Sequence, residues 1–293
     1  MKKNTVYKIL KLFTITLLFS CSFYSKSNNT EAISELQQNS IEIKNSGIGK
    51  TENLKNIQNL QQNQLLNNEK EMVIKNFTQR LNENEKLIQK IGPNISIFAP
   101  KINKDVLKIE PIDQFRINKN TFPENTQSHI LNLTLKDNQI RRLFYSSLDY
   151  NENKIKKLIS ILEQASSSTG YHYNVIGLIF WTGFKTQESF EKAVNLLTKN
   201  EQRRLMFNFD TKTVKDIQEK FEKLMQNRND WIKTVEKIID EYDNNIANVK
   251  ADGMILGEML RLEYEHKLNP DESMRIANDI ETLLKACCDH THY

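Results

Sequence analysis

Residues 171–184, YHYNVIGLIFWTGF, form the most apolar segment of the folded part of the chain. At 3.6 residues per turn, the apolar side chains point in nearly every direction around the helix axis (Val175, Ile176, Leu178, Ile179, Phe180 and Trp181). The run is shorter than the about 20 apolar residues that cross a bilayer. A helix that is apolar on every face is buried among other helices. The segment therefore predicts the centre of a helical bundle.

The sequence on both sides repeats its apolar residues at helical spacing. Such runs extend over Val73–Ile91, Ile140–Leu148, Ile155–Leu162, Thr186–Leu197, Val214–Ile239, Met254–Leu262 and Met274–Leu284. Only 8 Gly and 5 Pro occur in 293 residues, too few for the many turns of an all-β sandwich or barrel. We therefore predict an all-α fold, a compact bundle of roughly seven or eight helices over residues 71–293.

Turn residues and caps predict where several of these helices begin and end. Gly92-Pro93 is expected to end the first helix, and residues 92–123, which hold four of the five prolines, are expected to be mostly a connector. Asp137, Asn151 and Asp271 each precede an apolar run. We predict them to be N-caps, because their side-chain oxygens can accept from free amides in the first turn of a helix.

The positive charge of the chain is concentrated at its start. The formal net charge is +4, and Lys2, Lys3, Lys8 and Lys11 fall within the first 20 residues, which contain no acidic residue. The remaining 37 basic residues balance the 37 acidic residues. A chain without excess positive charge lacks the electrostatic footprint of a nucleic-acid-binding protein, so no nucleic acid is expected as a partner.

Residues 1–20 have the pattern of a secretory signal peptide. A positive region precedes a short apolar region that ends in Leu18-Phe19-Ser20-Cys21. These four residues resemble a bacterial lipobox, in which cleavage before the cysteine leaves a thiol that carries diacylglycerol. The alternative is an ordinary signal peptide that happens to contain a cysteine. Lipidation at Cys21 would anchor the mature chain to a membrane through its acyl chains.

Residues 21–70 predict a disordered polar tether between this anchor and the helical domain. They contain 16 Asn plus Gln residues and balanced charges, so they bury too little apolar surface to offset the entropy lost on ordering. A marginal helix is expected near the end of the tether, around Leu54, Ile57, Leu60 and Leu65. Fully extended, such a segment reaches about 165 to 180 Å, which would lift a folded domain clear of a lipid surface.

The segment IRRLFYSSLDY, residues 140–150, is followed by NENKIKKL, residues 151–158. With the lipobox and the Asn/Gln-rich tether, it resembles the Borrelia virulent-strain-associated outer-surface lipoproteins. That paralogous family includes the factor-H-binding complement regulator-acquiring surface protein. The resemblance covers residues 71 to 293. It implies a helical domain displayed outside the outer membrane during a tick-and-mammal life cycle, without enzymatic activity or a cofactor, and it does not specify the ligand.

The residues of this segment also have an interpretation that needs no resemblance. Amphipathic spacing predicts that Leu143, Phe144 and Leu148 belong to the core. The same spacing places Arg141 and Arg142 on a solvated turn. On this interpretation the segment is part of a helix and carries no binding role.

The C-terminal tail holds the densest group of metal-ligating residues, CCDHTH at residues 287–292. Thiolates and imidazoles suit Zn²⁺ and Cu, but adjacent cysteines lack the C-x₂-C spacing that lets two sulfurs converge on one ion. No metal site is therefore predicted. Cys287 and Cys288 are expected to be free thiols, with a cross-chain disulfide as the alternative. The familiar hydrolase, metalloprotease and nucleotide-binding motifs are missing from the sequence, so we predict no enzyme.

Two classes of function fit these features. The chain could be a surface lipoprotein that binds a host or tick-vector protein, with complement evasion through factor H or terminal complement components as a narrower version. It could instead be a structural coat lipoprotein without a specific ligand. An exposed apolar patch would favour binding, and a uniformly charged surface would favour the coat. We expect a monomer, because Asn269-Pro270 separates the last helix from its predecessor.

Overall fold

The computed structural model describes residues 50–118, 121–122, 129–167, 173–199, 206–207, 209–267 and 269–286. The signal peptide, the predicted lipidation site Cys21 and the tail with Cys287 and Cys288 lie outside these residues. The chain divides into two compact units, Met1–Val73 and Ile74–Tyr293. The fold described below is that of the second unit.

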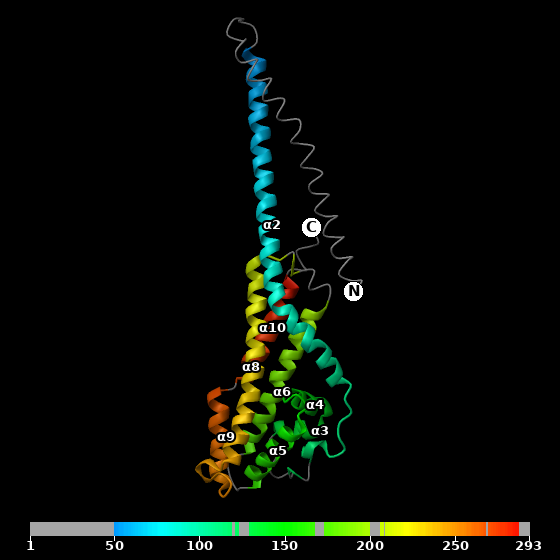
Figure 1. The fold of residues 1–293 in the computed structure, drawn as a ribbon, viewed down its shortest axis with the longest axis vertical. Coiled ribbons are helices and arrows are strands. Elements are labelled where there is room, and N and C mark those ends of the chain that lie inside the picture. Colours follow the sequence, from blue (N-terminus) through cyan, green and yellow to red (C-terminus); the bar gives the residue numbers. More distant parts are fainter. Residues whose placement is uncertain are drawn as a thin grey trace. The chain divides into compact units, whose positions relative to one another are not determined.

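The described residues form α-helices joined by turns, and they contain no β-strand (Figure 1). The helices are α2 (Lys50–Val106), α3 (His129–Lys136), α4 (Asn138–Ser147), α5 (Glu152–Ser167), α6 (Tyr173–Thr198), α8 (Thr211–Asp243), α9 (Gly253–Lys267) and α10 (Pro270–Ala286), with 3₁₀ turns η2 (Gln114–Arg116) and η4 (Ile246–Asn248). None of them combines the length and the apolar character needed to cross a membrane. The predicted all-α class is confirmed.

Helix α6 lies at the centre of the bundle, as its apolar sequence predicts. It contacts α3, α4, α5, α8, α9 and α10 (Figure 1). The prediction of two helices, over residues 171–184 and 186–197, is wrong, because α6 continues from Tyr173 to Thr198. Gly183 lies inside this continuous helix, where it leaves room for neighbouring aromatic rings. A Cβ atom there would lie 2.7 Å from Cζ2 of Trp231 and 2.9 Å from Cδ2 of Phe144.

Two separate apolar clusters form the core. The first joins η2, α3, α4, α5, the first half of α6, the second half of α8, and α9; its largest buried members include Phe122, Phe144, Phe180 and Trp231. The second joins α2, the second half of α6, the first half of α8, and α10, and includes Ile91, Phe190 and Phe221. Helices α6 and α8 therefore run through both clusters. Trp181, expected in the core, is only half-buried.

Helix α2 continues through the position where the sequence predicts its end. It contains Pro93 and Pro100 and ends at Val106, so the predicted stop at Gly92-Pro93 is wrong. Both prolines lie on the exposed face, seven residues apart, and the helix bends in this part (Figure 1). On the opposite face Ile91 and Ile95 are buried in the second cluster. Burial of this face offsets the hydrogen bonds that the prolines remove.

The beginning of α2 overlaps the sequence assigned to the tether. The helix starts at Lys50 and so includes the marginal helix expected around Leu54–Leu65. Further along, the predicted apolar face is covered only in part. Ile91 is buried, whereas Val73 and Phe77 are 64% and 47% exposed.

Side-chain caps set the starts of several helices. Asp137 accepts from the amides of Gln139 and Ile140 at 2.7 and 3.3 Å, which confirms the predicted cap of α4. Asn151 likewise accepts from the amide of Lys154 at 3.0 Å at the start of α5.

The predicted cap of the last helix is displaced by two residues. Asn269, and not Asp271, accepts from the amide of Glu272 at 3.1 Å. Pro270 is the first residue of α10. Proline suits this position because its missing amide would have no helical partner and its φ is already helical.

Candidate functional site

A layer of buried polar side chains separates the two apolar clusters. On α6 the first cluster ends at Phe180 and the second begins at Phe190; on α8 the second ends at Leu224 and the first resumes at Trp231. Between these limits lie the buried polar residues Thr182, Thr186, Gln187, Ser189 and Arg228. We call this set and the residues that bond to it the polar layer.

Arg228 lies at the centre of the polar layer. Its Nε donates to Oε1 of Gln187 at 2.8 Å, and its Nη2 donates to the Ser146 carbonyl at 3.1 Å and to Oδ1 of Asp149 at 2.6 Å. Burial alone would raise the pKa of Asp149. The charge of Arg228 and a hydrogen bond from Lys101 outweigh burial, so the pKa lies below its ordinary value.

A second charge pair lies next to Arg228. Arg142 of α4 holds the carboxylate of Glu191 on α6 through two hydrogen bonds of 3.1 and 2.9 Å. Gln187 donates both to the same carboxylate at 2.9 Å and to the hydroxyl of Ser146 at 3.1 Å. That hydroxyl lies 3.0 Å from Oδ2 of Asp105, the last buried residue of α2. The layer thus links α2, α4, α6 and α8.

A third pair lies beside the polar layer, at the start of α4. Arg141 binds Glu110 through bonds of 2.6 and 2.8 Å, and its Nη1 donates to the carbonyls of Thr134 and Leu135 at the end of α3. Burial acts to raise the pKa of Glu110, but hydrogen bonds from Arg141 and Tyr145 lower it below its ordinary value. The prediction that Arg141 and Arg142 lie on a solvated turn is therefore wrong.

The polar layer has a structural role. Its arginines and carboxylates face one another, so none of these carboxylates is left as an unpaired base. Among the described residues, no group of three or more His, Cys, Asp or Glu side chains could hold a metal ion. Buried ion pairs cost desolvation energy and can fix which helices pair and in which register. We assign that role to residues 141–149.

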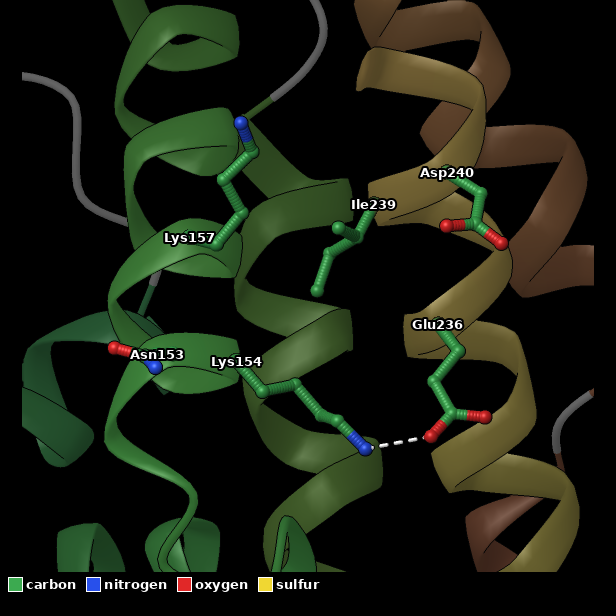
Figure 2. Close-up of a pocket in the computed structure, with 6 residues that line it drawn as sticks. All are labelled: Asn153, Lys154, Lys157, Glu236, Ile239 and Asp240. Carbon is green, nitrogen blue, oxygen red and sulfur yellow. Dashed lines mark hydrogen bonds and ion pairs between the residues drawn. The ribbon is translucent and has the colours of Figure 1, made fainter. Parts of the chain in front are cut away.

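A shallow cleft lies between α5 and α8, with a volume of about 370 Å³ (Figure 2). Lys154 of α5 reaches across it to Glu236 of α8, with 2.6 Å between Nζ and Oε1. Lys157, on the next turn of α5, pairs with Asp243. Both lysines that line the cleft are thus paired with carboxylates. The cleft therefore offers no concentrated charge to a ligand.

A larger hollow lies between the end of α8, η4 and α9, with a volume of about 500 Å³. We call it the α8–α9 groove. It is lined by Glu241, Ile246, Ala247, Val249, Met254, Ile255, Glu258, Met259, Leu262 and Glu263. Seven of these ten residues are apolar, and none is basic. The groove is therefore apolar with an acidic border.

Large apolar side chains remain exposed in this groove. The exposed fractions are 53% for Ile246, 64% for Met254, 37% for Ile255 and 41% for Leu262. A single exposed apolar residue is ordinary, whereas several that line one hollow make that hollow a candidate binding surface. Among the features described, the α8–α9 groove is the candidate functional site.

The backbone beside the groove is held in an uncommon conformation. Ala247 has φ of 52° and Asn248 has φ of 65°, both in the left-handed region. Such a conformation is disfavoured for alanine and is maintained here by the tight turn that follows α8. The amide of Lys250 donates to Oδ1 of Asn245 at 2.9 Å and closes this turn. The turn places Ile246 on the rim.

Sequence reasoning predicted α9 but missed the groove. It predicted a helix with apolar residues at helical spacing over Met254–Leu262 and did not separate the buried ones from the exposed ones. In the structure Leu256 and Leu260 are fully buried, whereas Met254 and Leu262 are exposed. The signal that could have revealed the groove is the spread of apolar residues around the helix. Leu256 and Leu260 already fill the buried face, so the other apolar residues extend beyond it.

Comparison with known proteins gives the family of the chain. The family described as Borrelia Bbcrasp-1 domain containing protein matches residues 104–285, more than half of the chain. No curated protein sequence matches. The solved structure of BSA64 of Borrelia spielmanii, orthologous to BBA64 of B. burgdorferi, has 24% identity and a TM-score of 0.52, covering 71% of this chain and 94% of its own.

A second solved structure has the same fold. The Lyme disease associated outer surface protein BBA65 of B. burgdorferi has 22% identity and a TM-score of 0.53, covering 69% of this chain and 98% of its own. At these identities the structural likeness shows a shared fold, while the family match rests on the sequence of residues 104–285. The chain therefore belongs to the Borrelia Bbcrasp-1 domain family, as the resemblance of residues 140–158 predicts.

Proposed function

We propose that the mature chain is a lipoprotein anchored through Cys21 in the outer membrane and facing outward, and that its helical domain binds a protein of the host or the tick vector. The chain has the lipobox pattern of such an anchor. A protein of the same fold, BBA65 of B. burgdorferi, is described as an outer surface protein. These features support display at the cell surface and give no support to catalysis.

The α8–α9 groove carries the proposal of binding over that of a passive coat. Ile246, Met254, Ile255 and Leu262 are partly exposed in a single hollow. Leaving such side chains in water forgoes about 25 cal/mol for each Å² of apolar surface that a partner could cover. A coat protein gains nothing from this exposure, whereas a binding protein uses it.

We also propose that the protein is a monomer. Helix α9 ends at Lys267 and α10 begins at Pro270. Helix α10 contacts α6 and α8 of its own chain, which supports a last helix that folds back instead of reaching a neighbouring copy. Factor H binding is accordingly expected to be weak or absent.

Binding is tested with the immobilised mature chain, residues 21–293, under reducing conditions. Host serum and tick gut extract are passed over it, and each retained protein is then purified and titrated. We expect at least one saturable ligand, and purified factor H is titrated separately. The absence of any saturable ligand from either source would contradict binding and support the coat. Submicromolar factor H binding would make complement evasion the leading function.

A further inference from the structure

One wall of the α8–α9 groove presents an evenly spaced apolar stripe. Ile255, Met259 and Leu262 follow one another at i, i+4 and i+7 on α9. At 1.5 Å per residue this stripe is about 10 Å long, or two helical turns. Grooves that accept an amphipathic helix read apolar anchors at this same spacing. The length of the stripe thus matches two to three turns of a partner helix.

Charged residues around the groove have one predominant sign. Glu241, Glu258 and Glu263 line it, and no lysine or arginine does. Residues 236–263, which form the end of α8, η4 and most of α9, include seven acidic and three basic residues. Residues 74–235 have the opposite balance, with 26 basic and 18 acidic residues. The near-neutral mature chain therefore has an excess of negative charge in the segment that contains the groove.

Local ion pairs leave this excess in place. Lys237 lies 3.2 Å from Glu241 and 2.5 Å from Glu263, and Arg261 lies 2.6 Å from Glu258. Lys237 and Arg261 are thus two cations close to these three glutamates, and over residues 236–263 as a whole the acidic residues still outnumber the basic ones by seven to three. A negative border attracts a positive partner and repels a negative one.

We infer that the α8–α9 groove docks an amphipathic helix of a partner protein whose apolar face is bordered by lysine or arginine. The apolar stripe would cover the partner's leucine-like anchors. The exposed carboxylate of Glu258 and the partly exposed carboxylate of Glu241 would face its basic flanks, while Glu263 is buried behind them. This inference rests on the proposed binding function and specifies the chemistry of the partner.

The test uses the mature chain and three designed helical peptides of 18 residues. The first has leucine on one face and lysine on its flanks, the second has glutamate in place of lysine, and the third is a scrambled version of the first. We expect the lysine-flanked peptide to bind at least tenfold more tightly than either of the others. We also expect its affinity to fall as salt rises from 50 to 300 mM, because the flanking charges are exposed.

Groove variants separate docking in the groove from general attraction to an acidic surface. Met254→Glu and Ile246→Glu place a charge on exposed apolar positions of the groove. Ile112→Glu makes the same change at a fully exposed position outside it. We expect the first two to weaken binding of the lysine-flanked peptide at least tenfold and the third to leave it unchanged. An unaltered thermal midpoint confirms folding, and Leu262→Ser replaces any variant that lowers it.

Two results would overturn the inference directly. One is that the three peptides bind with equal affinity. The other is that Ile112→Glu weakens binding as much as Met254→Glu does. Light scattering that shows a dimer, abolished by Met254→Glu, would assign the groove to a second copy of the chain. A host or tick ligand that binds Met254→Glu as tightly as the unmodified chain would refute the groove while leaving the binding function intact.

Discussion

Gly183 and Gly92 both lie inside helices, but one is tightly packed against other side chains and the other is not. Gly183 of α6 lies against the rings of Trp231 and Phe144, where a methyl group would approach ring carbons to under 3.0 Å. A Cβ atom at Gly92 of α2 would meet nothing within 4 Å beyond its chain neighbours and the nearby backbone of its own helix. From the sequence Gly92, together with Pro93, is predicted to end a helix, and in the structure both glycines lie inside continuous helices.

This contrast gives a matched pair of substitutions. We expect Gly183→Ala to lower the free energy of unfolding by about 1 to 3 kcal/mol, because the added carbon overpacks a core of aromatic rings. Gly92→Ala is expected to raise it by about 0.5 to 1 kcal/mol, since alanine loses less backbone entropy in a helix. Urea denaturation of both variants measures the difference. A more stable Gly183→Ala variant would show that the rings move aside without cost.

Within residues 141–149, helical spacing predicts the burial of the apolar residues correctly and that of the arginines wrongly. Leu143, Phe144 and Leu148 are buried as amphipathic spacing predicts. The same rule sends arginine to the surface, yet Arg141 is only 4% exposed. Its partner Glu110 lies 31 residues away in the sequence. Spacing on one helix cannot identify a partner at that distance.

At the scale of elements, local chemistry predicts helix starts better than helix ends. Asp137 and Asn151 cap α4 and α5 because a cap needs only its own side chain and the next three amides. The end of α2 depends instead on burial of Ile95 and Ile102 against helices much later in the chain. Helix α3 was not predicted, because its eight residues are too few to show a clear period.

The start of α10 offers a test that separates two candidate caps. We expect Asn269→Ala to cost about 1 kcal/mol of stability, because the amide of Glu272 loses the oxygen that caps it. Asp271→Ala should cost about 0.3 to 0.5 kcal/mol, since Asp271 only places a negative charge in the first turn. Thermal unfolding of the two variants checks the order. Equal losses would mean that the cap contributes nothing beyond the charge.

At the scale of the whole molecule, we propose separate roles for two distant parts of the sequence. The lipobox at Cys21 would direct the chain to the membrane, and residues 236–263 form an acidic, partly apolar surface within the folded domain. Two or three acyl chains hold a protein firmly on a bilayer, at about 0.8 kcal/mol per buried CH₂ group. The domain would then face whatever lies outside the cell.

The proposed address predicts a change of compartment on a single substitution. Proteinase added to intact cells is expected to remove the unmodified protein while a periplasmic marker stays intact. Cys21→Ala is expected to move the protein from the membrane fraction to a soluble fraction, because no thiol remains to carry the lipid. Immunoblots of both fractions provide the measurement. Protection of the unmodified protein in intact cells would contradict display on the surface.

The sequence by itself determined the helical class, the central place of α6, two of the helix caps, and the family, through residues 140–158. These properties depend on residue types within a few turns of one another. Only the tertiary structure decided that Arg141 is buried and Arg142 largely covered, that α2 passes through two prolines, and that one apolar arc of α9 stays uncovered. Each of these depends on which distant side chains supply a charge partner or an apolar cover, and local spacing does not specify those contacts.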